Sequence, residues 1–153
     1  MASFVNAADA IAAAIEVERR GYAFYSSVQE KAENPKDKEF FAFMANEEKR
    51  HQDLFMDMLK RIGGLRLPAQ STDQEYLDYL TAMLDHHSLF DPSLEQRIIA
   101  SPLHTAMQFE KDTLLFFIEM EDLVPDSEKQ HVRAVADEER RHLKLLGKIR
   151  HLK

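Results

Sequence analysis

The pentapeptide Glu47-Glu48-Lys49-Arg50-His51 recurs later in the chain as Glu138-Glu139-Arg140-Arg141-His142. In each copy the second glutamate and the histidine are three residues apart, so on a helix they lie on one face, one turn from each other. Such a pair can hold a metal ion between its two side chains. A single Glu-x-x-His is more often part of a solvated helix face, whereas two copies predict a pair of metal sites.

Apolar residues at intervals of three and four flank both copies, which predicts two helices that face a common core. The predicted interior positions around the first copy are Phe41, Met44, Glu48, His51, Phe55, Met58 and Ile62. Around the second copy they are Val132, Val135, Glu139, His142, Leu146 and Ile149. Glu47 falls outside this pattern, so Glu48 is the predicted metal ligand of the first glutamate pair.

A helix with one interior glutamate is predicted before each motif helix. The first starts after the N-cap residue Asn6 and runs to about Glu33, with interior positions Ile11, Ile15, Glu18, Tyr22 and Tyr25. The second starts at Ser101-Pro102, with interior positions Leu103, Met107, Glu110, Leu114 and Phe117. Turns are predicted at Asn34-Pro35 and Val124-Pro125. Gly21 costs helix propensity, which indicates a close approach between helices beside Glu18.

The two halves of the chain form an internal repeat. Glu18 precedes Glu48 by 30 residues, and Glu110 precedes Glu139 by 29. In antiparallel hairpins that turn at the two prolines, each single glutamate lies within one helical turn of its Glu-x-x-His partner. Four buried carboxylates need cations, because an uncompensated buried charge costs several kcal/mol, and no lysine or arginine shares these interior positions. Two divalent ions would balance them, with ligands Glu18, Glu48, His51, Glu110, Glu139 and His142.

Residues 63 to about 100 are too long for a hairpin turn and suit a crossover that runs the length of a bundle. Ser71 could cap a short helix within it, from about Thr72 to Asp85. We interpret His86-His87 as surface or loop residues rather than as a second metal site, because adjacent histidines point in different directions. The expected fold is an all-α four-helix bundle that forms a single domain over residues 1–153.

Composition supports this reading and excludes several kinds of function. The sequence has 153 residues with four glycines, five prolines and no cysteine, which favours helices and excludes thiolate metal sites and disulfides. Its formal net charge of −7 disfavours nucleic acid or an anionic membrane as a partner. It has neither a basic leader segment nor an apolar run of roughly 20 residues, so we expect a cytoplasmic protein.

The segment Glu18-Arg-Arg-Gly-Tyr-Ala-Phe-Tyr25, together with Glu47-Glu48-Lys-Arg-His51, resembles the rubrerythrin branch of the ferritin-like di-iron carboxylate proteins. The resemblance implies a ferritin-like bundle with two iron ions on the six residues above. It also implies Tyr25 as a hydrogen-bond partner of a ligand, reaction with peroxide or dioxygen, and a homodimer.

Three features depart from that family. Typical rubrerythrins carry a cysteine-rich rubredoxin domain that feeds electrons to the iron, and these residues contain none, so an external electron-donor protein is expected. Thr113 occupies the position of an extra carboxylate that typical members have three residues after the third-helix glutamate. Phe117 stands where Tyr25 of the first half would repeat.

The residues leave three functions open. The leading hypothesis is a di-iron oxidoreductase of peroxidase or ferroxidase type. The second is an iron-binding or storage protein, and the third is a helical interaction module with a vestigial site. Manganese is an alternative to iron, because both ions suit mixed imidazole and carboxylate ligands.

Overall fold

The computed structural model describes residues 6–63 and 74–149. These residues form helices and no strand, which confirms the all-α prediction for the described part of the chain. The elements are α1 (Ala7–Lys31), α2 (Pro35–Ile62), α3 (Gln74–Asp85), the 3-10 turn η2 (Ser88–Phe90), α4 (Leu94–Ala100), α5 (Pro102–Met120) and α6 (Asp126–Leu146).

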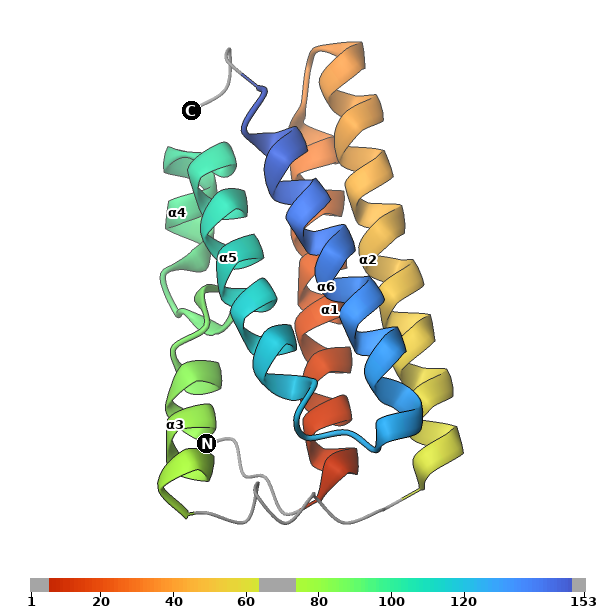
Figure 1. The fold of residues 1–153 in the computed structure, drawn as a ribbon. Coiled ribbons are helices and arrows are strands. Elements are labelled where there is room, and N and C mark those ends of the chain that lie inside the picture. Colours follow the sequence, from red (N-terminus) through yellow and green to blue (C-terminus); the bar gives the residue numbers. More distant parts are fainter. Residues whose placement is uncertain (1–5, 64–73, 150–153) are drawn as a thin grey trace.

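Two antiparallel hairpins, α1–α2 and α5–α6, make up a four-helix bundle (Figure 1). Between the hairpins, α1 contacts α5 and α2 contacts α6. Helices α2 and α5 run in the same direction, so the chain between them must return along the bundle (Figure 1). The elements α3, η2 and α4 make this return along the outside of α5. The crossover is therefore confirmed, whereas η2 and α4 were not predicted, and Ser71 and Thr72 lie outside the described residues.

The helix ends follow the predicted capping signals. The side chain of Asn6 accepts a hydrogen bond from the backbone N of Asp9 at 3.0 Å, and the Asp9 carboxylate accepts one from the backbone N of Asn6 at 3.1 Å. Asn34 caps α2 by accepting from the backbone N of Lys36 at 2.9 Å, and a proline stands at the first position of both α2 and α5. Gly63 ends α2 with φ +44°, a conformation that favours glycine.

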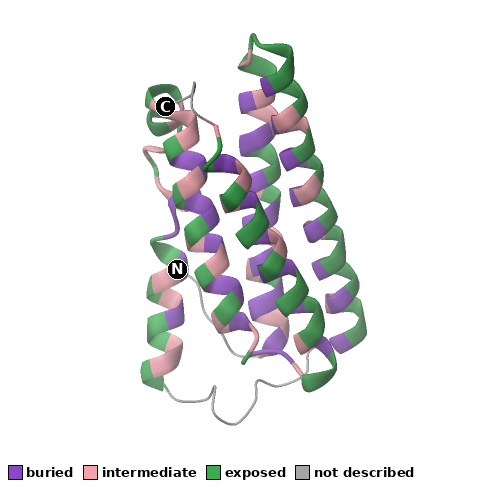
Figure 2. Cartoon of the chain, turned by 45° about the horizontal axis from the view of Figure 1, so that its top comes forward, coloured by how far each residue is buried: buried purple, intermediate pink, exposed green. Residues whose placement is uncertain are grey.

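Buried residues line the inner faces of the four long helices (Figure 2). All seven predicted interior positions of α2 are buried, as are those of α6, except Ile149, which follows the helix and is half-buried. Tyr22 was predicted to be interior but is 40% exposed, and Gly21 and Phe24 take its place in the core. The prediction chose Tyr22 over Gly21 because it considered only large apolar residues. A glycine can occupy an interior position where another side chain approaches.

Helix α5 also presents a different face from the predicted one. Glu110 and Phe117 are buried as expected, but Leu103, Met107 and Leu114 are only half-buried, as is Ile15 of α1. The core residues of α5 include Ala106, Phe109, Thr113, Phe116 and Met120. The crossover packs against a second side of α5, so this helix needs apolar residues on more than one face and its periodicity is blurred.

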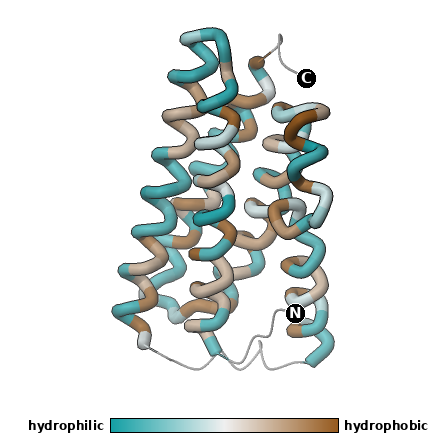
Figure 3. The backbone as a smooth tube through the Cα atoms, turned by 180° about the vertical axis from the view of Figure 1, so that it is seen from behind, coloured by the Kyte–Doolittle hydropathy of each residue, from teal (hydrophilic) through white to brown (hydrophobic). Residues whose placement is uncertain are grey.

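Hydrophilic residues recur along the helices between the apolar ones (Figure 3). No helix in residues 6–63 and 74–149 is long and apolar enough to cross a membrane.

Candidate metal centre

The six predicted ligand residues lie together in the middle of the bundle. Their side chains come from all four long helices, and each residue is at most 2% exposed: Glu18, Glu48, His51, Glu110, Glu139 and His142. They form two sets, in each of which one donor atom per residue lies within 4.8 Å of the others. The predicted level of the centre in the bundle is therefore confirmed, and the role of these residues as ligands stays a prediction.

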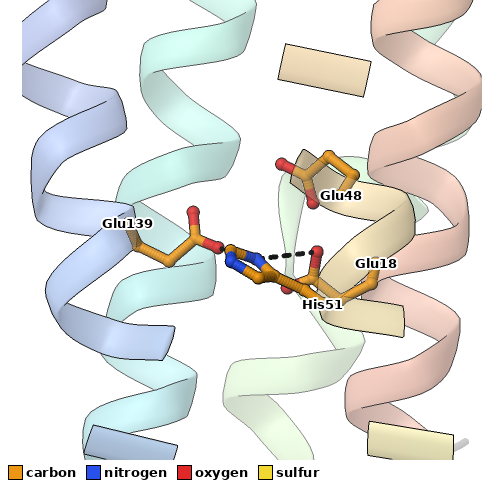
Figure 4. A group of neighbouring side chains, drawn as sticks. All are labelled: Glu18, Glu48, His51 and Glu139. Carbon is orange, nitrogen blue, oxygen red and sulfur yellow. Dashed lines mark ion pairs between the residues drawn. The ribbon is translucent and has the colours of Figure 1, made fainter. Parts of the chain in front are cut away.

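The first set contains Glu18, Glu48, His51 and Glu139. The imidazole Nδ1 of His51 lies 2.9 Å from Oε1 of Glu139 and 3.6 Å from Oε2 of Glu18 (Figure 4). These side chains extend from α1, α2 and α6 toward a common point (Figure 4). One nitrogen and several carboxylate oxygens therefore converge there, which is a donor set for a divalent cation.

The second set contains Glu48, Glu110, Glu139 and His142, so it shares two carboxylates with the first. Nδ1 of His142 lies 3.3 Å from Oε2 of Glu139 and 3.9 Å from Oε1 of Glu110. The rings of His51 and His142 are nearly parallel, at 23°, with their centroids 5.8 Å apart. The two sets are thus adjacent and related by the internal repeat.

Most polar atoms of this cluster lack a hydrogen bond. They include both carboxylate oxygens of Glu18 and Glu139, one oxygen each of Glu48 and Glu110, and the Nδ1 atoms of both histidines. Buried polar groups are rarely left without partners in folded proteins. Because the unpartnered atoms are oxygens and imidazole nitrogens aimed at two adjacent points, the residues fit a pair of metal ions.

The pKa values of these groups also show that the cluster favours bound positive charge. Burial raises the pKa of the Glu48 carboxyl well above 4.5, as it does for Glu110, and it also raises the pKa of Glu18. Burial would lower the pKa of His51, but neighbouring carboxylates, Glu18 first, raise it to about 12. Burial would raise the pKa of Glu139, but the adjacent Glu110 carboxyl and the imidazoles of His142 and His51 bring it below its usual value. Without metal the cluster therefore retains protons, which bound cations would displace.

Gly21 provides space for one of the shared carboxylates. A Cβ atom at this position would lie 2.8 Å from Oε2 and 2.9 Å from Cδ of Glu48. The close approach predicted at Gly21 is therefore present, and the approaching group is the Glu48 side chain.

Tyr25 lies deep in the core and contacts the ligand cluster. Its hydroxyl donates a hydrogen bond of 2.6 Å to Oε1 of Glu110, and the ring contacts Phe24, Phe41 and Phe109. Burial, reinforced by the Glu110 charge, raises the pKa of Tyr25 well above 10, so the phenol stays protonated. This contact agrees with the predicted place of Tyr25 beside a ligand, and it joins the α1–α2 hairpin to α5.

A family model for rubrerythrin matches residues 9–150, nearly the whole sequence. The chain belongs to the rubrerythrin family. The fold is similar to that of a ferritin-like diiron-carboxylate protein from Thermotoga maritima, with 22% identity, a TM-score of 0.62 and coverage of 94% of this chain and 93% of that one. A search of curated proteins found no significant match.

In this rubrerythrin-family chain the outer glutamates of the two pentapeptides lie beside the histidines of the cluster, which sequence reasoning missed. Oε2 of Glu138 lies 2.5 Å from Nε2 of His51, and Oε1 of Glu47 lies 3.6 Å from Nε2 of His142. Each outer carboxylate thus faces the histidine of the other hairpin. The hydrogen bond with His51 and contact with Arg50 lower the pKa of Glu138 to about 2. The doubling of glutamate in both copies was the signal that could have revealed this role.

Thr113 and His87 adjoin the rubrerythrin-family centre without belonging to either ligand set. Thr113 is buried on α5, and its Oγ1 lies 2.9 Å from Nε2 of His87. His86 and His87 both lie in the loop between α3 and η2, as predicted, but His87 is only 2% exposed. Its burial was not foreseen, because residues 87–90 lie against the bundle, a tertiary contact that local sequence does not encode.

Proposed function

We propose that this rubrerythrin-family protein is a di-iron oxidoreductase whose centre reacts with peroxide or dioxygen. The observation that carries the proposal is the pair of donor sets that share Glu48 and Glu139. Glu48 and Glu139 would be available to both ions of a pair. Two divalent ions would supply four positive charges for the four carboxylates of the cluster, Glu18, Glu48, Glu110 and Glu139.

The chain's own groups have separate tasks in this proposal. His51 and His142 would hold metal through Nδ1, and Glu138 orients the His51 ring by its hydrogen bond with Nε2. Glu47 faces Nε2 of His142 at 3.6 Å. Tyr25 keeps its proton and donates a hydrogen bond at Glu110. Buried apolar side chains around the cluster exclude water from it: Met44, Phe41, Phe55, Phe109 and Phe117. A bound pair of reduced iron ions supplies two electrons to an oxidant.

The supply of electrons requires a partner. The 153 residues contain no cysteine, so a thiolate-bound iron centre that returns electrons to the site would lie outside them. We therefore propose an external electron-donor protein, and we propose a homodimer from the family relationship. Iron is the proposed metal, and manganese is the alternative, since imidazole and carboxylate ligands suit both.

Iron binding or storage is the second candidate, and the ferritin-like fold favours it. In that case the same two sites would oxidise incoming Fe(II) and pass it on. A vestigial site in an interaction module is disfavoured, because all six donor residues are present and buried.

Metal analysis of the iron-loaded protein is the first test. We expect close to two ions per chain, loss of both in Glu48→Ala, and retention of both in Glu47→Ala, because Glu48 belongs to both donor sets and Glu47 to neither. Equal and complete loss in both variants would contradict the ligand assignment.

Rapid mixing of the anaerobically reduced protein with each oxidant then separates the functions. A peroxidase should be oxidised by stoichiometric hydrogen peroxide and turn over only with an added reductase. Faster oxidation by dioxygen, followed by conversion of excess Fe(II) into mineral, would instead support storage. Gel filtration adds an independent measurement, since a shell assembly favours storage and a dimer favours the enzyme.

A further inference from the structure

Residues 87–90, here called the flank segment, cover the bundle on the side of α1 and α5. Arg20 donates a hydrogen bond of 3.3 Å to the backbone carbonyl of Leu89, and its guanidinium lies 4.3 Å from the ring centroid of Phe90. The backbone N of Ser88 donates to Oδ2 of Asp112 at 3.0 Å. Arg20 and Asp112 are each two residues from a predicted ligand, so the flank segment is fastened at the level of the metal centre.

His87 places a neutral imidazole in this segment. The backbone N of Leu89 donates to its Nδ1 at 3.1 Å, so Nδ1 is an acceptor and the ring proton resides on Nε2. Burial lowers the pKa of His87 to about 4, which keeps the ring neutral near pH 7. Nε2 therefore donates the hydrogen bond of 2.9 Å to Oγ1 of Thr113.

This bond leaves the hydroxyl proton of Thr113 available. Within the described part of the chain, His87 is the only hydrogen-bond partner of that hydroxyl. Thr105, two turns earlier on the same helix, shows the usual alternative, since its hydroxyl bonds the backbone carbonyls of Ser101 at 2.8 Å and Arg97 at 3.0 Å. Thr113 differs from Thr105 because its hydroxyl oxygen accepts a hydrogen bond from His87 and its hydroxyl proton is not donated to a backbone carbonyl.

Thr113 also lies on the face of α5 that carries Glu110. The two residues are three positions apart and both are buried, so their side chains are neighbours one turn apart. Oε2 of Glu110 has no hydrogen-bond partner. A free hydroxyl proton thus lies beside the donor sets, on the side that the flank segment covers.

We propose that Thr113, oriented by His87, donates a hydrogen bond to a small anion, of the hydroperoxide or azide class, that binds at the metal centre on the side of α1 and α5. The inference rests on the proposed metal function. His87 is a positioning residue in it, because its imidazole contacts Thr113 and not the anion. Without His87 the hydroxyl would be free to turn back to the carbonyl of the preceding helical turn.

The test is azide binding to the iron-loaded full chain. The charge-transfer absorbance of the ferric protein monitors the binding. We expect Thr113→Val, which removes the hydroxyl and keeps the shape, to bind azide about tenfold more weakly, the effect of one hydrogen bond to a charged group. Thr113→Ser should bind azide as the wild type does. Thr105→Val is the matched control, a buried threonine of the same helix, and should leave azide affinity unchanged.

A double-mutant cycle tests the positioning role. His87→Leu should weaken azide binding about fivefold in the wild-type background and not at all when Thr113 is already valine. A purely structural effect of His87 would weaken binding equally in both backgrounds and would overturn its role. Should Thr113→Val fold poorly, Thr113→Ala allows the same comparison.

The remaining outcomes separate this inference from the proposed function. Unchanged azide affinity in a Thr113→Val protein that holds the wild-type amount of iron would overturn the inference and leave the metal function intact. A wild-type protein that binds no metal would overturn both.

Discussion

Glu138 of α6 meets His51 of α2 across the interface of the two hairpins, with Oε2 2.5 Å from Nε2. The opposite nitrogen of the same ring faces the ligand cluster, 2.9 Å from Glu139. A carboxylate in this position fixes the ring orientation of a metal-binding histidine and raises its basicity. The two neighbouring glutamates of α6 therefore have different positions: Glu139 lies within the ligand cluster, and Glu138 contacts the far side of the His51 ring.

Removing the outer carboxylate should weaken metal binding without destroying the site. For Glu138→Ala we expect metal affinity about 10- to 100-fold lower, because the His51 ring loses the group that orients it. Competition with a chelator measures the change. Asp137→Ala is the control, since Asp137 is a surface residue paired with Arg140 and should have no effect. Equal affinities in the wild type and Glu138→Ala would show that the ring is held by packing alone.

Gly21→Ala should separate the stability of the apoprotein from metal affinity. Alanine raises helix propensity by about 1 kcal/mol, but its Cβ would lie 2.8 Å from Oε2 of Glu48 and force that carboxylate to move. We expect an apoprotein at least as stable as the wild type and a metal affinity lower by an order of magnitude or more. Gly147→Ala, whose Cβ meets only backbone at 3.4 Å or beyond, is the control. Unchanged metal binding in Gly21→Ala would mean that Glu48 is not held in its observed position.

Tyr25→Phe should destabilise the folded protein by about 1–3 kcal/mol, because Glu110 loses a buried hydrogen-bond donor. Urea unfolding of the metal-loaded protein measures this. Tyr79→Phe provides the comparison, since Tyr79 is 44% exposed and bonds Glu119 at the surface, so little change is expected there. Similar losses in the two variants would contradict a special role for the buried phenol.

The apoprotein should become less stable as pH rises from mildly acidic to neutral. The raised pKa values of Glu18, Glu48 and Glu110 mean that, above the usual carboxyl value of 4.5, the folded state binds more protons than the unfolded chain. The free energy of unfolding then falls as pH rises through the folded-state values. His87 opposes this trend, because its lowered pKa removes stability as pH falls from 6.5 toward about 4. It is one group against four, since the raised pKa of His51 acts in the same direction as the three carboxyls above pH 6.5.

Thermal unfolding at about pH 5.5 and about pH 7.5 checks this prediction. The metal-loaded protein should show the reverse dependence, because protons compete with metal for the same carboxylates. An apoprotein that is equally stable at both values would indicate that the carboxylates are solvated.

Much of the centre could be predicted because α2 and α6 each have one apolar face. On such helices a Glu-x-x-His among apolar residues must face the core. The prolines at the hairpin turns then fix its height along the bundle. Helix α5 gave no comparable signal, since Leu114 to Ile118 are all apolar and periodicity cannot choose among them. There the structure was needed to separate Phe116, which is buried, from Leu114, which is half-buried.

The contacts of Glu47, Glu138 and His87 could not be predicted for a different reason. Each depends on a residue far away in the sequence, on another element of the bundle. Local patterns place a side chain on a face of its own helix, but they do not identify its partner. The short elements η2 and α4 were not predicted either, because three and seven residues are too few to show a clear periodicity.

The division of the bundle into two hairpins has a consequence for local unfolding. Most contacts between helices lie within the hairpins α1–α2 and α5–α6, and each hairpin contributes three of the six predicted ligands. Bound metal would therefore hold together two hairpins that otherwise make few contacts with each other. When the ions leave, amide hydrogen exchange should accelerate along the faces where the hairpins meet, and the helices inside each hairpin should keep their protection.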